Sequence, residues 1–133
     1  METKLNLYIV LYLLFAHWVA DFIFQTDKMA KGKSSDNIQL LSHTVVYSSI
    51  MCFLLAILSL ILTFYFDTFF HPIQVTFFTL ITFVIHTIQD YITSRINTKL
   101  YNKGKIHEFF VSIGFDQFLH FVQLLLTYNL LFN

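Results

Sequence analysis

The sequence predicts an all-α protein, an integral-membrane bundle of four transmembrane helices. Of the 133 residues, 56% are hydrophobic and only 12% are charged, whereas an ordinary soluble domain is about one-quarter charged. The apolar residues gather in four long stretches, and three glycines and one proline in the whole chain leave few points at which a helix would break. Long apolar runs without alternation favour helices in lipid, because a helix satisfies its own backbone hydrogen bonds.

The four predicted spans cover residues 5–24, 38–66, 73–96 and 109–132, and together they form a single membrane domain over 1–133. Each is long enough to cross a hydrocarbon core, which needs about 20 helical residues. The second span is long enough to tilt, and Pro72 suits the start of the third. The first span exceeds the usual apolar part of a signal peptide and carries His17 and Asp21, so we expect it to be retained.

Two polar links, at 25–37 and 97–108, carry most of the positive charge. Together with Arg95 they hold seven of the eight lysines and arginines. In a four-span chain both links lie on the same side of the membrane, and the positive-inside rule places them in the cytoplasm. We therefore expect a multi-pass protein with both termini outside.

Ionisable side chains inside the predicted spans are the most informative feature of this chain. A charged residue at the bilayer centre costs roughly 2.5–3.5 kcal/mol on insertion scales, so such residues persist mainly where a function or a partner requires them. Three His–Asp pairs are spaced four residues apart, which puts both members of each pair on one helix face. The seven residues are His17, Asp21, His43, His86, Asp90, Asp116 and His120.

All seven are predicted to lie in one layer near the cytoplasmic face, because at about 1.5 Å per residue each falls roughly 6–17 Å from that boundary. Imidazole and carboxylate ligands together suit zinc, manganese or iron. Four histidines and three aspartates exceed what one tetrahedral zinc needs, and they fit two ions about 3.5–4 Å apart with one aspartate bridging. We expect one or two divalent ions, with zinc as the first candidate.

A hydrolytic site fits this set better than an oxygen-activating di-iron site. Di-iron bundles use glutamates, and the only glutamates, Glu2 and Glu108, lie outside the predicted spans. We expect a metal-dependent hydrolase of a membrane lipid or lipid-linked phosphoester, in which a metal-activated water is the nucleophile. Catalytic roles are expected for Asp21, Asp90 and Asp116, support of the ligands for Gln25, Gln89 and Gln117, and binding of an anionic head group for Lys28, Lys31, Lys33 and Arg95.

Two other kinds of function remain open on the sequence alone. The same residues could serve a non-enzymatic ion or metal carrier, although the outer half of the bundle offers few polar residues for a path. The polar layer could also lock together the helices of a small membrane subunit. The formal net charge of zero argues against a nucleic-acid partner. So little mass outside the membrane is compatible with a homo-oligomer, but no stripe of small residues marks an interface.

One motif resembles a known family. The stretch from Ala16 to Thr26, AHWVADFIFQT, closely resembles the opening motif of a bacterial and phage membrane-protein family, domain of unknown function 3307. The resemblance implies a bacterial inner (cytoplasmic) membrane protein and covers essentially the whole chain, but this family has no established activity. More loosely, the chain is similar to inner-membrane proteins described as metal-dependent hydrolases. The resemblance to domain of unknown function 3307 continues through Lys33, Leu41-Ser42-His43, His86, Asp90, Asp116-Gln117 and His120.

Overall fold

The structure is a computed structural model that describes residues 5–132, and over that range it is helical with no strand. The all-α prediction is confirmed. The elements in chain order are α1 (Leu7–Trp18), a π-helical turn η1 (Val19–Ile23), α2 (Asp27–Gly32), α3 (Asn37–Phe66), α4 (Pro72–Asn102) and α5 (Ile106–Phe132).

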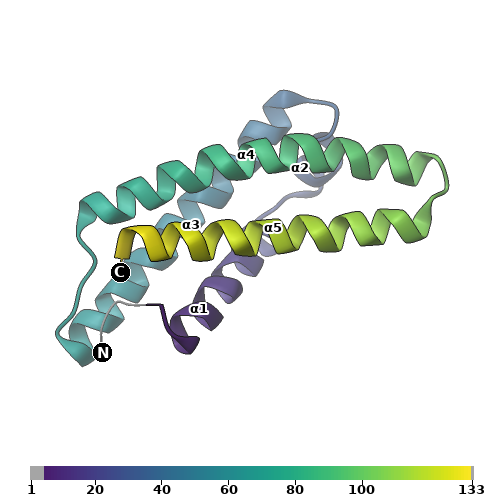
Figure 1. Ribbon diagram of the computed structural model, residues 1–133. Helices are drawn as coiled ribbons and strands as arrows, with labels where there is room; N and C mark the ends of the chain where they lie inside the picture. Colours follow the sequence, from purple (N-terminus) through teal and green to yellow (C-terminus); the bar gives the residue numbers. More distant parts are fainter. Residues whose placement is uncertain (1–4, 133) are drawn as a thin grey trace.

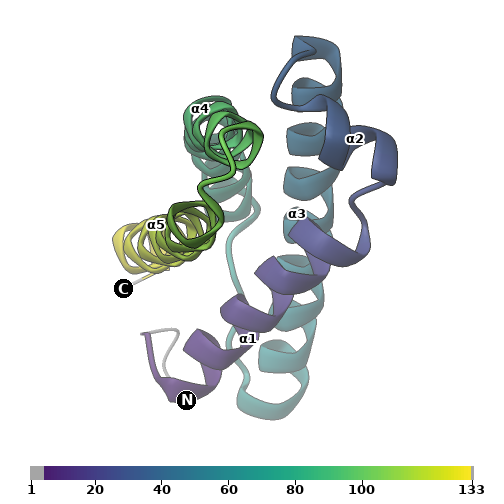
Figure 2. The same cartoon turned by 90° about the vertical axis from the view of Figure 1, so that its right-hand side faces the viewer.

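The helices form two crossing layers. α4 and α5 make an antiparallel hairpin, and α3 crosses this hairpin instead of running alongside it (Figure 1). Viewed along the hairpin, α1 passes diagonally across α3 (Figure 2). The start of α1 and the end of α5 lie toward the end that holds the α3–α4 connection, away from the α4–α5 connection (Figure 1). The crossing brings His43, near the start of α3, against His86 in the middle of α4.

Within residues 5–132, three helices are long and apolar enough to cross a membrane. They are α3, α4 and α5, with 30, 31 and 27 residues. The first predicted span is shorter than the others, because α1 has 12 residues and continues only through the 5 residues of η1 to Ile23. The fold therefore combines three potential membrane spans with one shorter apolar helix.

The two basic links, at 25–37 and 97–108, contain helical segments and are not long irregular loops. The 25–37 segment contains α2, which starts with Thr26 accepting a hydrogen bond from Met29 N–H at 3.3 Å. In the 97–108 segment, α4 continues to Asn102, past the expected end at residue 96, because no glycine or proline interrupts it before Gly104. Gly104 adopts a left-handed φ of 69°, and Lys105 N–H bonds to Leu100 O at 3.1 Å. This glycine-dependent cap ends the helix.

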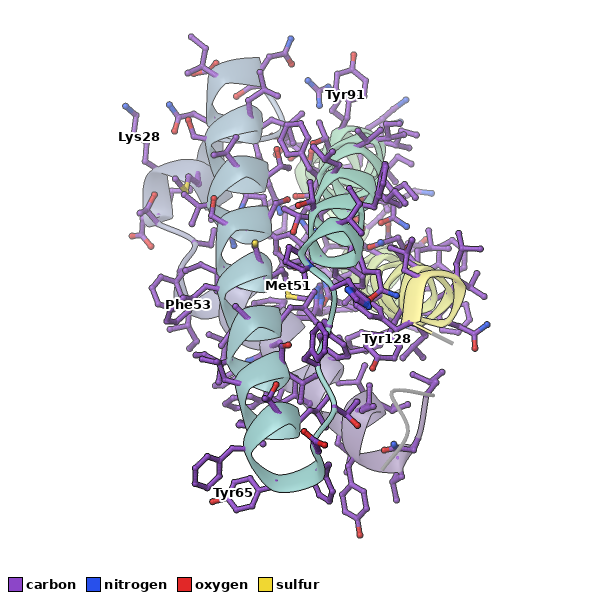
Figure 3. All side chains as sticks on the ribbon, turned by 90° about the vertical axis from the view of Figure 1, so that its left-hand side faces the viewer. Lys28, Met51, Phe53, Tyr65, Tyr91 and Tyr128 are labelled. Atoms are coloured by element: carbon purple, nitrogen blue, oxygen red, sulfur yellow. The ribbon has the colours of Figure 1, made fainter. Side chains whose placement is uncertain are left out.

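Apolar side chains divide between a core and the outer surface. Met51 and Tyr128 are fully buried between the layers, whereas Phe53 and Tyr65 are mostly exposed and point away from α4 and α5 (Figure 3). Large apolar side chains are also exposed along α1, α4 and α5. Extended exposed apolar surface marks contact with a membrane or with other proteins.

Candidate metal centre

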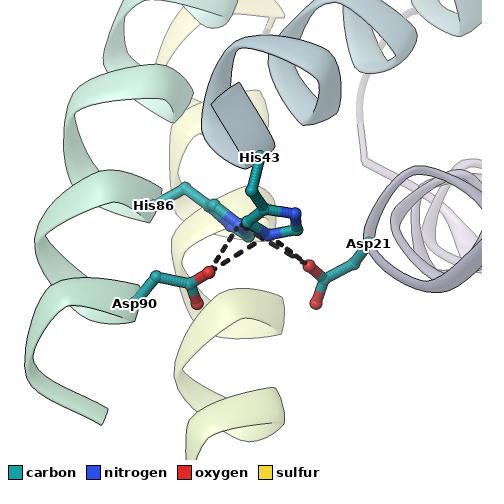
Figure 4. Close-up of side chains that lie close together, drawn as sticks. All are labelled: Asp21, His43, His86 and Asp90. Carbon is teal, nitrogen blue, oxygen red and sulfur yellow. Dashed lines mark hydrogen bonds and ion pairs between the residues drawn. The ribbon is translucent and has the colours of Figure 1, made fainter. Parts of the chain in front are cut away.

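Four buried side chains from three parts of the chain converge at the centre of the structure (Figure 4). Asp21 comes from η1, His43 from α3, and His86 and Asp90 from successive turns of α4. The Nε2 atom of His43 lies 3.0 Å from Asp21 Oδ1 and 3.1 Å from Asp90 Oδ2. His86 Nε2 lies 3.7 Å and 3.6 Å from the same two oxygens, and the two Nε2 atoms are 3.2 Å apart.

These separations match the edges of a small coordination tetrahedron. With zinc–ligand bonds of about 2.0–2.1 Å, neighbouring ligand atoms in a regular tetrahedron lie about 3.3–3.4 Å apart. The measured separations run from 3.0 to 3.7 Å around that value, and the four ligand atoms all lie within 4.8 Å of one another. Asp21, His43, His86 and Asp90 could therefore hold a divalent metal ion.

The balance of protons and charge at this point also favours a cation. His43 Nε2 carries at most one proton, yet three atoms that would each accept it lie within 3.2 Å. Two buried carboxylates carry negative charge that must be paired to be tolerated, and the Lys33 ammonium at Asp90 supplies one positive charge. A divalent ion would satisfy all four ligand atoms at once.

A second group shares Asp90 with the first. It consists of Asp90, Asp116 and His120, whose ligand atoms also lie within 4.8 Å of one another. His120 Nδ1 donates to the backbone carbonyl of Asp116 at 2.8 Å, which leaves the lone pair on Nε2, 3.6 Å from Asp90 Oδ1. Among the described residues, neither His120 Nε2 nor Asp116 Oδ1 has a hydrogen-bond partner. Asp90 thus presents Oδ2 to one group and Oδ1 to the other.

His17 lies beside both groups, but both of its ring nitrogens are engaged. Tyr47 donates its hydroxyl to Nδ1 at 2.8 Å, and Nε2–H donates to Gln117 Oε1 at 3.0 Å. The His17 ring stacks on His120 at a centroid distance of 5.4 Å. Tyr47 also stacks on His86, with centroids 3.8 Å apart and planes 11° apart. His17 and Tyr47 therefore brace the imidazoles that face the centre.

Lys33 is the one lysine of the predicted head-group set that reaches the cluster. Its ammonium donates to Asp90 Oδ2 at 2.8 Å, and the side chain is 18% exposed. Burial alone would lower the pKa of Lys33, but the carboxylates of Asp90 and Asp21 outweigh it and raise the pKa above its usual range. Ser94 donates to the backbone carbonyl of Lys33 at 3.5 Å, which holds this link against α4.

A cleft of about 480 Å³ opens beside the cluster. Asp21, Asp116 and Gln117 line it on the cluster side, and Lys33 lines it from the 25–37 link. Its other polar lining residues include Gln25, Lys31, Ser34, Ser94, Asn97 and Thr98. The cleft gives a small molecule access to the buried carboxylates.

The remaining predicted site residues take up different positions. Gln117 Nε2 points to Asp21 Oδ2 and Asp116 Oδ2, each at 3.5 Å. Within the described part of the chain, Gln89 Oε1 is buried without a hydrogen-bond partner. Lys28 is exposed on α2, and Lys31 pairs with Asp27 at 3.6 Å. Arg95 stacks on Tyr91 at 3.7 Å and bonds to Asn37 at 2.9 Å, so it does not face the cluster.

Four features of the site were not predicted from the sequence. The π-helical turn that carries Asp21, closed by Phe24 N–H to Val19 O at 3.2 Å, leaves no clear sequence signal, although such turns are frequent at functional sites. Helical spacing could have found the others. Tyr47 follows His43 by one turn, and Ser94 and Asn97 continue the face of α4 that carries Asp90.

The family comparison adds one decisive finding. The model of the family described as protein of unknown function, DUF3307, matches residues 9–133. The chain belongs to this family. The match confirms the resemblance seen in the AHWVADFIFQT motif, and all seven ionisable residues of the cluster lie inside the matched range. No curated protein and no solved structure matches the chain.

Proposed function

We propose that this member of the DUF3307 family is a metal-dependent hydrolase of the bacterial inner membrane that acts on a lipid or lipid-linked phosphoester. The convergence of Asp21, His43, His86 and Asp90 on tetrahedral spacing carries this proposal. The adjoining cleft with Lys33 at its edge supports it, because the cleft connects the cluster with a space large enough for a head group.

The proposed placement in the membrane rests on the helices and on the charges. α3, α4 and α5 could span the bilayer, with the shorter α1 packed across α3 as the fourth element. The 25–37 and 97–108 segments would face the cytoplasm and both termini would lie outside. On this placement the cleft opens toward the inner leaflet, because Lys31, Lys33 and Ser34 of the first link line it.

A direct test of this placement uses single cysteines in a Cys52→Ser background. Lys103→Cys, at the α4–α5 connection, should react with a membrane-impermeant maleimide only after the cells are opened. Phe69→Cys, at the α3–α4 connection, should react in intact cells. The reverse pattern would contradict the proposed orientation.

The four residues of the first group would hold one ion, with zinc as first candidate and manganese or iron as alternatives. Asp116 and His120 would hold a second ion that shares Asp90 as a bridge. An ion in this position supplies Lewis-acid stabilisation of a phosphoryl oxygen and lowers the pKa of a coordinated water.

The chain's own residues would supply the remaining chemistry. Asp116 lines the cleft, so the carboxylate oxygen that does not hold the second ion is placed to take the proton from the attacking water. In the reaction, the water oxygen bonds to phosphorus, the bond from phosphorus to the leaving oxygen breaks, and that oxygen takes up a proton. The Lys33 ammonium would stabilise negative charge on the phosphoryl group.

Hydrolysis of phospholipids in mixed micelles, followed by phosphorus NMR, tests this function. Wild-type protein should cleave at least one phosphoester after zinc or manganese is added and should lose that activity when a chelator removes the metal. Asp116→Asn should lower kcat by at least about 100-fold. Asp27→Asn is the matched control, because Asp27 forms only an exposed pair with Lys31. Metal-loaded protein that cleaves none of the phospholipid classes would overturn the hydrolase proposal.

A further inference from the structure

We propose that the cleft beside the metal centre binds a phospholipid whose head group carries free hydroxyls, as in phosphatidylglycerol. This inference deepens the proposed function by naming the class of lipid. It starts from two amide side chains, Gln25 and Asn97, that belong to residues lining the cleft. Within residues 5–132, Gln25 Oε1 and Asn97 Oδ1 are buried and have no hydrogen-bond partner.

The two unpaired oxygens call for hydrogen-bond donors from a ligand. A buried acceptor left without a donor costs about 1–3 kcal/mol, so unpaired groups usually mark a missing partner. Gln25 follows η1 and Asn97 lies on α4, so the two acceptors come from separate parts of the chain. A ligand with two or more hydroxyls could donate to both of them.

The positively charged side chains at this cleft favour a ligand that carries a phosphate group. Lys33 and Lys31, one of the two lysines of α2, both line it. An ion held by Asp21 and Asp90 would add positive charge on the cluster side and would neutralise their carboxylates. A phosphate group would then meet positive charge from two directions, whereas a cationic head group such as choline would meet repulsion and offer no donor to the amide oxygens.

The apolar part of the lining points to a lipid and not to a soluble sugar phosphate. Phe22, Phe109 and Ile113 line the same cleft as the lysines. Phe22 is 48% exposed, and Phe110, which directly follows Phe109 on α5, is 65% exposed. Acyl chains could lie on this outer apolar surface while the phosphate and the hydroxyls enter the polar part of the cleft.

Native mass spectrometry in a non-denaturing detergent tests the proposal. The probes are phosphatidylglycerol, phosphatidylethanolamine, phosphatidylcholine and soluble glycerol 3-phosphate, each titrated against the metal-loaded protein. We expect phosphatidylglycerol to bind about tenfold more tightly than the other two lipids. Gln25→Leu and Asn97→Leu should each weaken phosphatidylglycerol binding about fivefold and leave phosphatidylcholine binding unchanged.

The control variant is Asn102→Leu, which changes an exposed amide at the end of the same helix as Asn97. It should bind every probe as the wild type does. Both test variants remove an oxygen that has no partner in the described structure, so they should melt at or above the wild-type temperature. Folding failure is therefore not the expected reason for lost binding.

The outcomes separate this inference from the proposed function. Metal-loaded protein that binds the three lipids equally, prefers phosphatidylethanolamine, or binds glycerol 3-phosphate as tightly as phosphatidylglycerol would overturn the head-group site alone. A phosphatidylglycerol preference that both leucine variants retain would also overturn it. Protein that never takes up metal but keeps the preference would overturn the proposed hydrolase and leave the head-group site standing.

Discussion

The imidazole rings of His43 and His86 face each other through their Nε2 atoms at 3.2 Å, although they come from different helices. Two neutral imidazoles in contact share one proton at most, and here each nitrogen also faces the carboxylates of Asp21 and Asp90. Such a surplus of acceptors is typical of residues that could hold a metal ion. The consequences can be tested residue by residue.

Asp90 should matter more for metal binding than any other residue, because its two oxygens serve both groups. Asp90→Asn should reduce bound metal to less than about one-tenth of the wild-type content. His120→Gln should remove no more than one ion and leave the first group loaded. Elemental mass spectrometry on the purified variants measures both effects. Equal metal loss in the two variants would contradict a shared aspartate.

Lys33 should oppose metal binding while it assists the reaction. Its ammonium lies 2.8 Å from Asp90 Oδ2, so Lys33→Met removes a positive charge next to the metal position. We expect metal affinity to rise about tenfold and kcat/KM to fall at least about tenfold. Lys28→Met changes an exposed lysine on α2 and should alter neither quantity. A competition titration with a zinc indicator measures the affinity, and a fall would contradict the account.

Two substitutions at Tyr47 distinguish the contribution of its stacked ring from that of its hydroxyl hydrogen bond. Tyr47→Phe keeps the ring that stacks on His86 but leaves His17 Nδ1 without its donor, so stability should fall by about 1–2 kcal/mol with metal content unchanged. Tyr47→Ala also removes a fully buried ring and should cost about 3–5 kcal/mol and lower metal affinity about 10–100-fold. Denaturation in detergent and metal titration measure the two effects. Metal loss in Tyr47→Phe would show that the hydroxyl matters directly.

The two glycines of the α4–α5 hairpin should respond oppositely to alanine. Gly104 has a left-handed φ of 69° at the end of α4, so Gly104→Ala should destabilise by about 1 kcal/mol. Gly114 lies inside α5, and an added Cβ would meet no described atom within 4 Å. Gly114→Ala should therefore stabilise by about 0.5–1 kcal/mol. Thermal melting compares them, and a stabilising Gly104→Ala would contradict the left-handed cap.

The helical class of the fold could be predicted because apolar composition and length decide it with little help from tertiary detail. The helix ends were harder. The end of α4 at Asn102 depends on the conformation of Gly104, and the shortened first span depends on the π turn before Phe24. Neither the left-handed cap nor the π turn changes hydropathy, so composition alone could not place them. The crossing of α3 over the hairpin depends on side-chain packing, which no linear pattern records.

The sequence predicted which residues would gather but not what each would contact. Charged residues in apolar runs are rare enough to identify His17, Asp21, His43, His86, Asp90, Asp116 and His120 as a set, and the structure brings all seven together. Spacing could not show that His17 would be held by Tyr47 and Gln117, because that depends on the rotation of each helix. Nor could it single out Lys33 among the basic residues of the links.

The most direct test of the metal centre is the metal content and metal environment of the wild-type protein purified in detergent. Elemental mass spectrometry should find at least one zinc, manganese or iron per chain. X-ray absorption should show nitrogen and oxygen neighbours at about 2.0–2.1 Å, with two imidazoles and no sulfur if the ion is zinc. His43→Ala should remove the ion of the first group, which lowers the metal content by one ion per chain. A folded wild-type protein that holds no metal, even after incubation with each of the three ions, would contradict the account.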